Sequence, residues 1–169
     1  MLVVNTSFSR TWGAPPANGV DIEPDHPTFR LVNISFEDVR CVGNSGQGFE
    51  VSPATLNSSS APLSISVRGL YVSGAGALPE PANPELPAQG NLSYRLGGGV
   101  AFTSHLYPAE IGLQGSVEIA EAVVEDTAEA GVLMLSWSTG VRVSISDSVL
   151  HNVVRSPARG PSPLFCASI

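Results

Sequence analysis

The sequence predicts an all-β protein: a solenoid of about four to five short parallel coils with one long Pro-rich loop. The first observation is the segment at residues 19–24, in which apolar and polar residues alternate after an initial glycine. Side chains on an extended strand alternate between its two faces, so the apolar residues of this segment share one face. The segment recurs in one close copy and two looser ones, which begin at Gly48, Gly99 and Gly131.

The second observation is another recurring strand, with apolar residues two positions apart. The interval from this strand to the next copy of the first segment is the same in two repeats. Gly48 comes 14 residues after Ile34, and Gly131 comes 14 residues after Val117. Repeats of about 20–30 residues are typical of solenoids, in which a coil buries its apolar face only by stacking on its neighbours. The apolar pairs of this strand are Ile34 and Phe36, Ile65 and Val67, Val117 and Ile119, and Val143 and Ile145.

A further short segment begins three residues past each apolar pair of the second strand, and we expect a tight bend at the residue just before it. Gly and Asp suit a bend with a left-handed backbone, and Glu suits it less well. The four bend residues are Asp38, Gly69, Glu121 and Asp147.

Stacked coils place equivalent residues in ladders about 4.8 Å apart and join their strands into parallel sheets. Burying each aliphatic side chain contributes about 1.5–3 kcal/mol, so four coils suffice for a core. The two predicted ladders are Ile34, Ile65, Val117 and Val143 in one sheet and Val20, Phe49, Val100 and Val132 in another.

The repeat predicts one solenoid domain over residues 1–155 and an irregular tail over residues 156–169. Extra residues rich in proline predict a surface loop at about residues 75–98. Residues 117–130 are rich in Ala and Glu and suit an amphipathic helix as well, but the 14-residue interval favours a strand. Further coils, or a covering domain outside this chain, are open alternatives.

Three stretches resemble a known family. The sequence Gly-Val-Asp-Ile-Glu-Pro at residues 19–24, together with residues 31–39 and 44–48, is similar to the right-handed parallel β-helix repeat proteins of pectin-lyase-like fold. The resemblance extends over about residues 19–154. It implies a right-handed solenoid, an extracellular or cell-surface location, and either action on polysaccharides or a non-catalytic role.

Charge and composition exclude several function classes. The net charge is −7 and the cations are all Arg, with no basic cluster to bind nucleic acid or an anionic membrane. No apolar stretch approaches the ~18 residues of a membrane span. The lack of Lys excludes a Lys-containing phosphate loop and a Schiff-base enzyme. Cys41 occupies an apolar strand position, where we expect a buried thiol.

The candidate catalytic residues are Asp21, Glu23, Glu50 and His26. Stacking of the copies would place Asp21 and Glu50 about 5 Å apart on the outward face, with Glu23 two residues along the strand. Such a group is able to act as general acid and base on a polysaccharide, or to hold Ca²⁺ through its oxygens. No organic cofactor is expected. The alternative is that these acids are solvated or structural, as outward strand residues usually are.

The outward residue at the position of Asp21 and Glu50 changes from acidic to apolar in the later copies, where Ala101 and Leu133 occupy the equivalent positions. A strand that is apolar on both faces is normally covered, and the Pro-rich loop or a missing domain are the candidate covers. Weaker candidates for ligand contact are Arg30, Arg40, Arg68, His105, Tyr107 and Trp137.

Two functional hypotheses follow. By resemblance, the first is a carbohydrate-active or carbohydrate-binding module, with polysaccharide as the partner. The second is a non-catalytic structural, adhesive or interaction segment of a larger surface protein. Fold alone does not choose between them.

Overall fold

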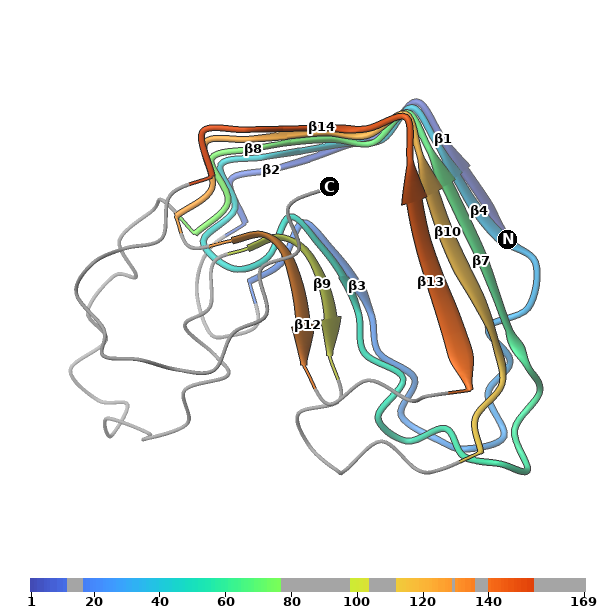
Figure 1. Ribbon diagram of the computed structural model, residues 1–169. Coiled ribbons are helices and arrows are strands. Elements are labelled where there is room, and N and C mark those ends of the chain that lie inside the picture. Colours follow the sequence, from blue (N-terminus) through green and yellow to red (C-terminus); the bar gives the residue numbers. More distant parts are fainter. Residues whose placement is uncertain (12–16, 77–97, 104–111, 129, 136–139, 154–169) are drawn as a thin grey trace, which may run out of the picture.

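A computed structural model describes residues 1–11, 17–76, 98–103, 112–128, 130–135 and 140–153. The described residues form an all-β structure of three parallel sheets, consistent with a parallel β-solenoid (Figure 1). Sheet A, on the right of Figure 1, contains β1 (Leu2–Val4), β4 (Ile34–Glu37), β7 (Leu63–Arg68), β10 (Gly115–Ala120) and β13 (Val141–Ser146). Sheet B, along the top, contains β2 (Ser7–Ser9), β5 (Arg40–Val42), β8 (Tyr71–Ser73), β11 (Val123–Glu125) and β14 (Val149–His151). Sheet C contains β3 (Val20–Ile22), β6 (Phe49–Val51), β9 (Gly98–Thr103) and β12 (Ala130–Leu135).

The chain visits the sheets in the order A, B, C and then repeats, and we call each such passage a coil. Every strand of the described residues pairs in parallel with the equivalent strand of a neighbouring coil. In Figure 1 the colours of each sheet therefore run in sequence order from one edge to the other.

Both predicted ladders are confirmed by the pairing register. In sheet A, Ile65 lies between Ile34 and Val117, and Val117 pairs in turn with Val143. In sheet C, Phe49 lies between Val20 and Val100, and Val100 pairs with Val132. Strands β10 and β11 cover residues 117–120 and 123–125 of the segment that suited a helix, so the alternative helix is wrong there.

The core lies between the three sheets and is formed by the inward residues of the strands. Phe49 is fully buried and meets Phe36 of sheet A edge to face, with ring centroids 5.2 Å apart. Cys41 is also fully buried, as expected, and burial raises the pKa of its thiol to about 12. A thiol in that state is a small apolar core residue and not a nucleophile.

The four predicted bends between sheets A and B are confirmed. Their φ angles are 53° at Asp38, 67° at Gly69, 56° at Glu121 and 50° at Asp147, all in the left-handed region. Glu121 adopts this backbone although Glu has no local preference for it, and its carboxylate pairs with Arg68 at 2.5 Å. A second column of residues with a left-handed backbone follows the strands of sheet B, and the sequence analysis did not predict it. These residues are Arg10, Gly43, Gly74, Asp126 and Asn152.

The glycine that opens each sheet C repeat is explained by close packing. A Cβ atom on Gly48 would lie 2.2 Å from a methyl carbon of Val72, and one on Gly99 would lie 2.1 Å from a methyl carbon of Val124. Sheets B and C approach so closely at this corner that no side chain fits. The Pro-rich loop and the tail expected at residues 156–169 lie outside the described residues, except at the edges of the loop.

Candidate functional site

The candidate site lies on the outward face of sheet C in the first two coils. Asp21 of β3 pairs directly with Glu50 of β6, as the sequence predicts. The two residues differ in environment, because Asp21 is exposed whereas Glu50 is only 3% exposed. Of the alternative that these acids are solvated or structural, the solvated half is therefore wrong for Glu50, whereas a structural role agrees with its burial.

Glu50 is held by hydrogen bonds from both neighbouring coils. Asn18, just before β3, donates from Nδ2 to Glu50 Oε2 at 2.6 Å. Thr103, at the end of β9, donates from its hydroxyl group to Glu50 Oε1. Both partners are donors, so both carboxylate oxygens of Glu50 act as acceptors.

The pKa of Asp21 is raised to about 6. Partial removal of the carboxyl group from water is the main cause, and the charges of Glu50 and Glu23 add to it, while a hydrogen bond with Asn18 acts in the opposite direction. A carboxyl group with a pKa near 6 exchanges a proton close to neutral pH, which is the property expected of a general acid or base.

Glu23 and His26 flank this pair in different ways. Glu23 is exposed and acts on Asp21 through its charge. His26 is also exposed, and its Nδ1 lies 2.8 Å from the hydroxyl oxygen of Thr28. Its ring packs at 6.1 Å from that of Phe29, which is 51% exposed. The structure thus pairs Asp21 with Glu50 and leaves Glu23 close enough to act on Asp21 through its charge, and it directs the hydrogen bonds of His26 to its own loop.

The Ca²⁺ alternative finds no support in the described part of the chain. Within it, no group of three or more His, Cys, Asp or Glu side chains is placed to hold a metal ion. Nor do these residues include a helix of the length and apolar character needed to cross a membrane.

Further along sheet C the outward face is buried. Ala101 and Leu133, which continue the column of Asp21 and Glu50, are 0% and 3% exposed. Ser52 is also buried, and its hydroxyl group has no hydrogen-bond partner among the described residues. The prediction that this part of the face is covered is confirmed. The Pro-rich loop expected to cover it lies mostly outside the described residues, as do His105, Tyr107 and Trp137.

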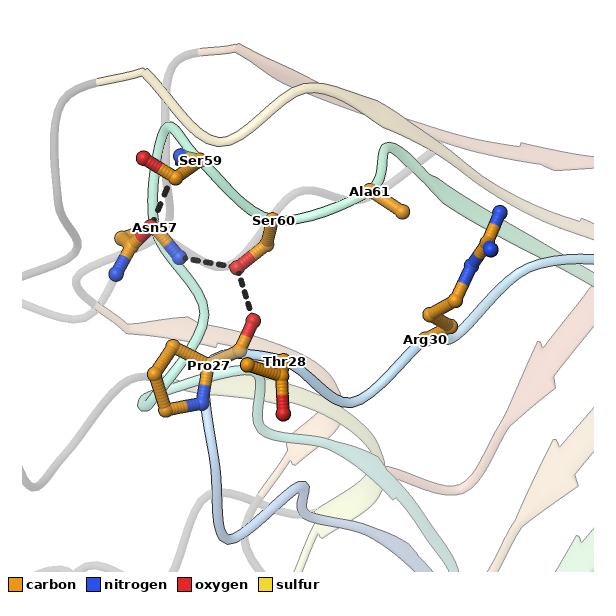
Figure 2. Close-up of a pocket in the computed structure, with 7 residues that line it drawn as sticks. All are labelled: Pro27, Thr28, Arg30, Asn57, Ser59, Ser60 and Ala61. Carbon is orange, nitrogen blue, oxygen red and sulfur yellow. Dashed lines mark hydrogen bonds between the residues drawn. The ribbon is translucent and has the colours of Figure 1, made fainter.

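A hollow of about 560 Å³ lies between the loops that lead from sheet C to sheet A in successive coils (Figure 2). Ser60 joins the two loops by donating a hydrogen bond to the Pro27 carbonyl oxygen at 2.7 Å, and it accepts one from the backbone N–H of Asn57. Arg30 lines the far side of the hollow and makes no ion pair with the described residues. Of the other weaker Arg candidates, Arg40 lies over the Tyr71 ring and Arg68 pairs with Glu121.

Sequence reasoning missed Asn18, Gln47 and the role of Thr103. Asn18 and Gln47 each precede the opening glycine of a sheet C repeat, and Gln47 donates its backbone N–H to Asn18 Oδ1 at 2.7 Å. Gln47 Oε1 accepts in turn from the backbone N–H of Gly98 at 2.6 Å. A polar residue at the same place in two successive repeats was the signal that pointed to this network.

Comparison of the chain with models of known protein families, with curated proteins and with solved structures finds no match in any of the three. Inferences about function therefore rest on the residues of this chain and on the geometry of the site.

Proposed function

We propose that this chain is a carbohydrate-active or carbohydrate-binding module whose ligand lies along the outward face of sheet C. The observation that carries the proposal is the pairing of an exposed Asp21, with a pKa near 6, with a buried Glu50 whose two carboxylate oxygens both accept hydrogen bonds. The pectin-lyase-like resemblance supports the same proposal, and with it a right-handed solenoid of extracellular or cell-surface location.

In this proposal Asp21 is the group that gives or takes the proton, because it is exposed and titrates near neutral pH. Glu50 is too buried to touch a polymer, and it acts on Asp21 through its charge. Glu23 lies about 6.6 Å along the strand and is exposed, so it is able to contact the ligand directly. Phe29, beside His26, offers an exposed apolar ring of the kind on which sugar rings stack.

A panel of pectic, alginate and neutral polysaccharides tests this proposal, with new reducing ends and unsaturated products as the readouts. We expect activity on at least one polymer, loss of that activity in Asp21→Asn, and no loss in Glu118→Gln, an exposed acid of sheet A. Retention on an immobilised glycan, weakened in Phe29→Ala, would support binding without catalysis. Absence of both activity and retention over the whole panel would contradict the proposal.

The second candidate function is a non-catalytic interaction segment, and a different observation favours it. The free edge of the first coil carries a hollow of about 550 Å³, lined by inward apolar residues that include Val3, Phe8 and Val20. Met1 and Leu2 are 68% and 62% exposed beside it. Apolar surface at a free sheet edge favours pairing with another strand or coil.

Light scattering coupled to size-exclusion chromatography tests this second function. Association that increases with protein concentration, and that Val3→Asp abolishes, would support it. A monomer at all concentrations would contradict self-association through this edge.

A further inference from the structure

Asparagine is followed two residues later by Ser or Thr at four places in the chain: Asn5, Asn33, Asn57 and Asn91. This triplet, with no proline at its centre, is the acceptor sequence for N-linked glycosylation. The chain has eight asparagines, and Ser and Thr together make up 29 of its 169 residues, so chance would give about one such triplet. The triplets are therefore more frequent than composition explains. Asn91 lies outside the described residues.

The three described asparagines outside these triplets all use their side-chain NH₂ groups in hydrogen bonds to a neighbouring coil. The acceptors are Glu50 Oε2 for Asn18 at 2.6 Å, the Phe8 carbonyl oxygen for Asn44 at 3.4 Å, and Asp126 Oδ1 for Asn152 at 2.5 Å. Asn44 is also completely buried. A bulky group on any of these nitrogens would break a contact that joins two coils.

The three described asparagines inside the triplets differ, since none of their NH₂ groups has a hydrogen-bond partner among the described residues. Asn5 and Asn33 are exposed, and Asn57 is half-buried. The amide oxygens of Asn33 and Asn57 do accept hydrogen bonds, from the Ser64 hydroxyl group at 3.5 Å and from the Ser59 backbone N–H at 2.9 Å. Because these bonds engage only the oxygen, the nitrogen of each amide stays available.

Each of these asparagines lies at a bend or in a loop, outside the strands of sheet C. Asn5 links β1 to β2 and Asn33 directly precedes β4, with left-handed φ angles of 49° and 53°. Asn57 lies in the loop from β6 to β7, and Figure 2 shows its side-chain nitrogen pointing away from Ser60. Groups attached to these nitrogens extend into solvent and leave the outward face of sheet C free.

We propose that Asn5, Asn33 and Asn57 carry N-linked glycans. In the transfer, the asparagine Nδ2 forms a bond to the anomeric carbon of a sugar, and the bond from that carbon to a phosphate oxygen of a polyprenyl-diphosphate-linked oligosaccharide breaks. The diphosphate leaves with the bonding electron pair and the amide nitrogen loses one proton, so nothing is oxidised or reduced. The inference rests on the extracellular location proposed above, and it does not depend on any action on polysaccharides.

Secretion of the full chain from cultured mammalian cells, behind a cleavable signal sequence, tests the inference. Peptide mass spectrometry after treatment with a peptide N-glycosidase locates each glycan, because the enzyme converts a glycan-bearing Asn to Asp. We expect this conversion at the three proposed acceptors and not at Asn18, Asn44 or Asn152. The glycosylated chain should have the same circular dichroism spectrum and thermal unfolding midpoint as the treated chain.

Ser59→Ala should abolish glycosylation at Asn57 alone, because it removes the hydroxyl group of the triplet and keeps the backbone N–H that Asn57 Oδ1 accepts. Ser59→Thr is the matched control and should retain the glycan. A secreted chain whose three proposed acceptors are unmodified, or in which only Asn91 is modified, would overturn the inference. So would a glycosylated chain that folds only after its glycans are removed. Failure of the polysaccharide assays would leave the glycan masses unchanged, so the two failures are distinguishable.

Discussion

Asp21 and Glu50 lie opposite each other on neighbouring parallel strands, and only Glu50 is buried. Two acids in such close register oppose each other's ionisation. The stacking of nearly identical repeats produces this arrangement, because a repeat that places an acid at one outward position places the next acid beside it.

The first prediction concerns the pH dependence of stability. The raised pKa of Asp21 means that the folded chain binds this proton more tightly than the unfolded chain does, so stability is lost as the pH rises from about 4 to about 6. Asp21→Asn should remove this loss. We expect the free energy of unfolding at pH 8 to increase by ~1 kcal/mol, after allowance for solvent screening of an exposed group, and to change little at pH 4.

Urea denaturation at both pH values provides the measurement. Asp25→Asn, in the exposed loop that follows β3, serves as the control and should show no such pH-dependent gain. An equal effect of Asp21→Asn at pH 4 and pH 8 would count against a raised pKa of Asp21.

The second prediction concerns the corner between sheets B and C. Gly48→Ala should destabilise the fold by ~2 kcal/mol or more, because its Cβ would overlap the Val72 side chain and lie 2.7 Å from the Gly99 carbonyl oxygen. In the double variant with Val72→Ala, the loss should be smaller than the sum of the two single losses. Additive losses in this double-mutant cycle would show that the glycine is not required by close packing against Val72.

The third prediction concerns the bend between sheets A and B. Glu121→Gly should stabilise the chain by ~0.5–1 kcal/mol, because it relieves a left-handed backbone while the exposed contact with Arg68 contributes little. Gly69→Ala, at the equivalent bend, should be destabilising, since its Cβ would also lie 2.5 Å from Asp38 Oδ1. Thermal unfolding of both variants measures this, and loss of stability in Glu121→Gly would refute the prediction.

The fourth prediction concerns the sheet A ladder. Ile65 is 2% exposed between two neighbouring coils, so Ile65→Ala should cost about 2–5 kcal/mol. Val143, in the fifth coil, is only partly buried, and Val143→Ala should cost clearly less. Equal losses measured by chemical denaturation would be inconsistent with coils stacked in this order.

The ladders and the first bends could be predicted from the sequence, because inward apolar residues and bend residues repeat at regular spacing. The second column of bends was missed because it begins with Arg10, a residue with no preference for a left-handed backbone, although Gly43 and Gly74 follow it. The burial of Glu50 could not be predicted either. Alternation assigns a side chain to a face of the sheet and says nothing about what covers that face.

Local pattern marks Asn18 and Gln47 as polar residues at equivalent places in two repeats, but the partners that form the network around Glu50 were not predictable from it. Asn18 and Thr103 lie 32 and 53 residues from Glu50 in the chain, and they meet it only because the coils stack in register. Gln47 and Gly98 are brought together in the same way. Contacts between coils depend on the full register and on the side-chain orientation of each neighbour.

The titration midpoint of the Asp21 carboxyl group in the folded wild-type protein tests most directly whether sheet C carries a proton-exchanging acid. Carbon-detected NMR across pH 3 to 8 provides this value. We predict a midpoint near pH 6. A midpoint near pH 4, as for an ordinary aspartate, would contradict the proposed site.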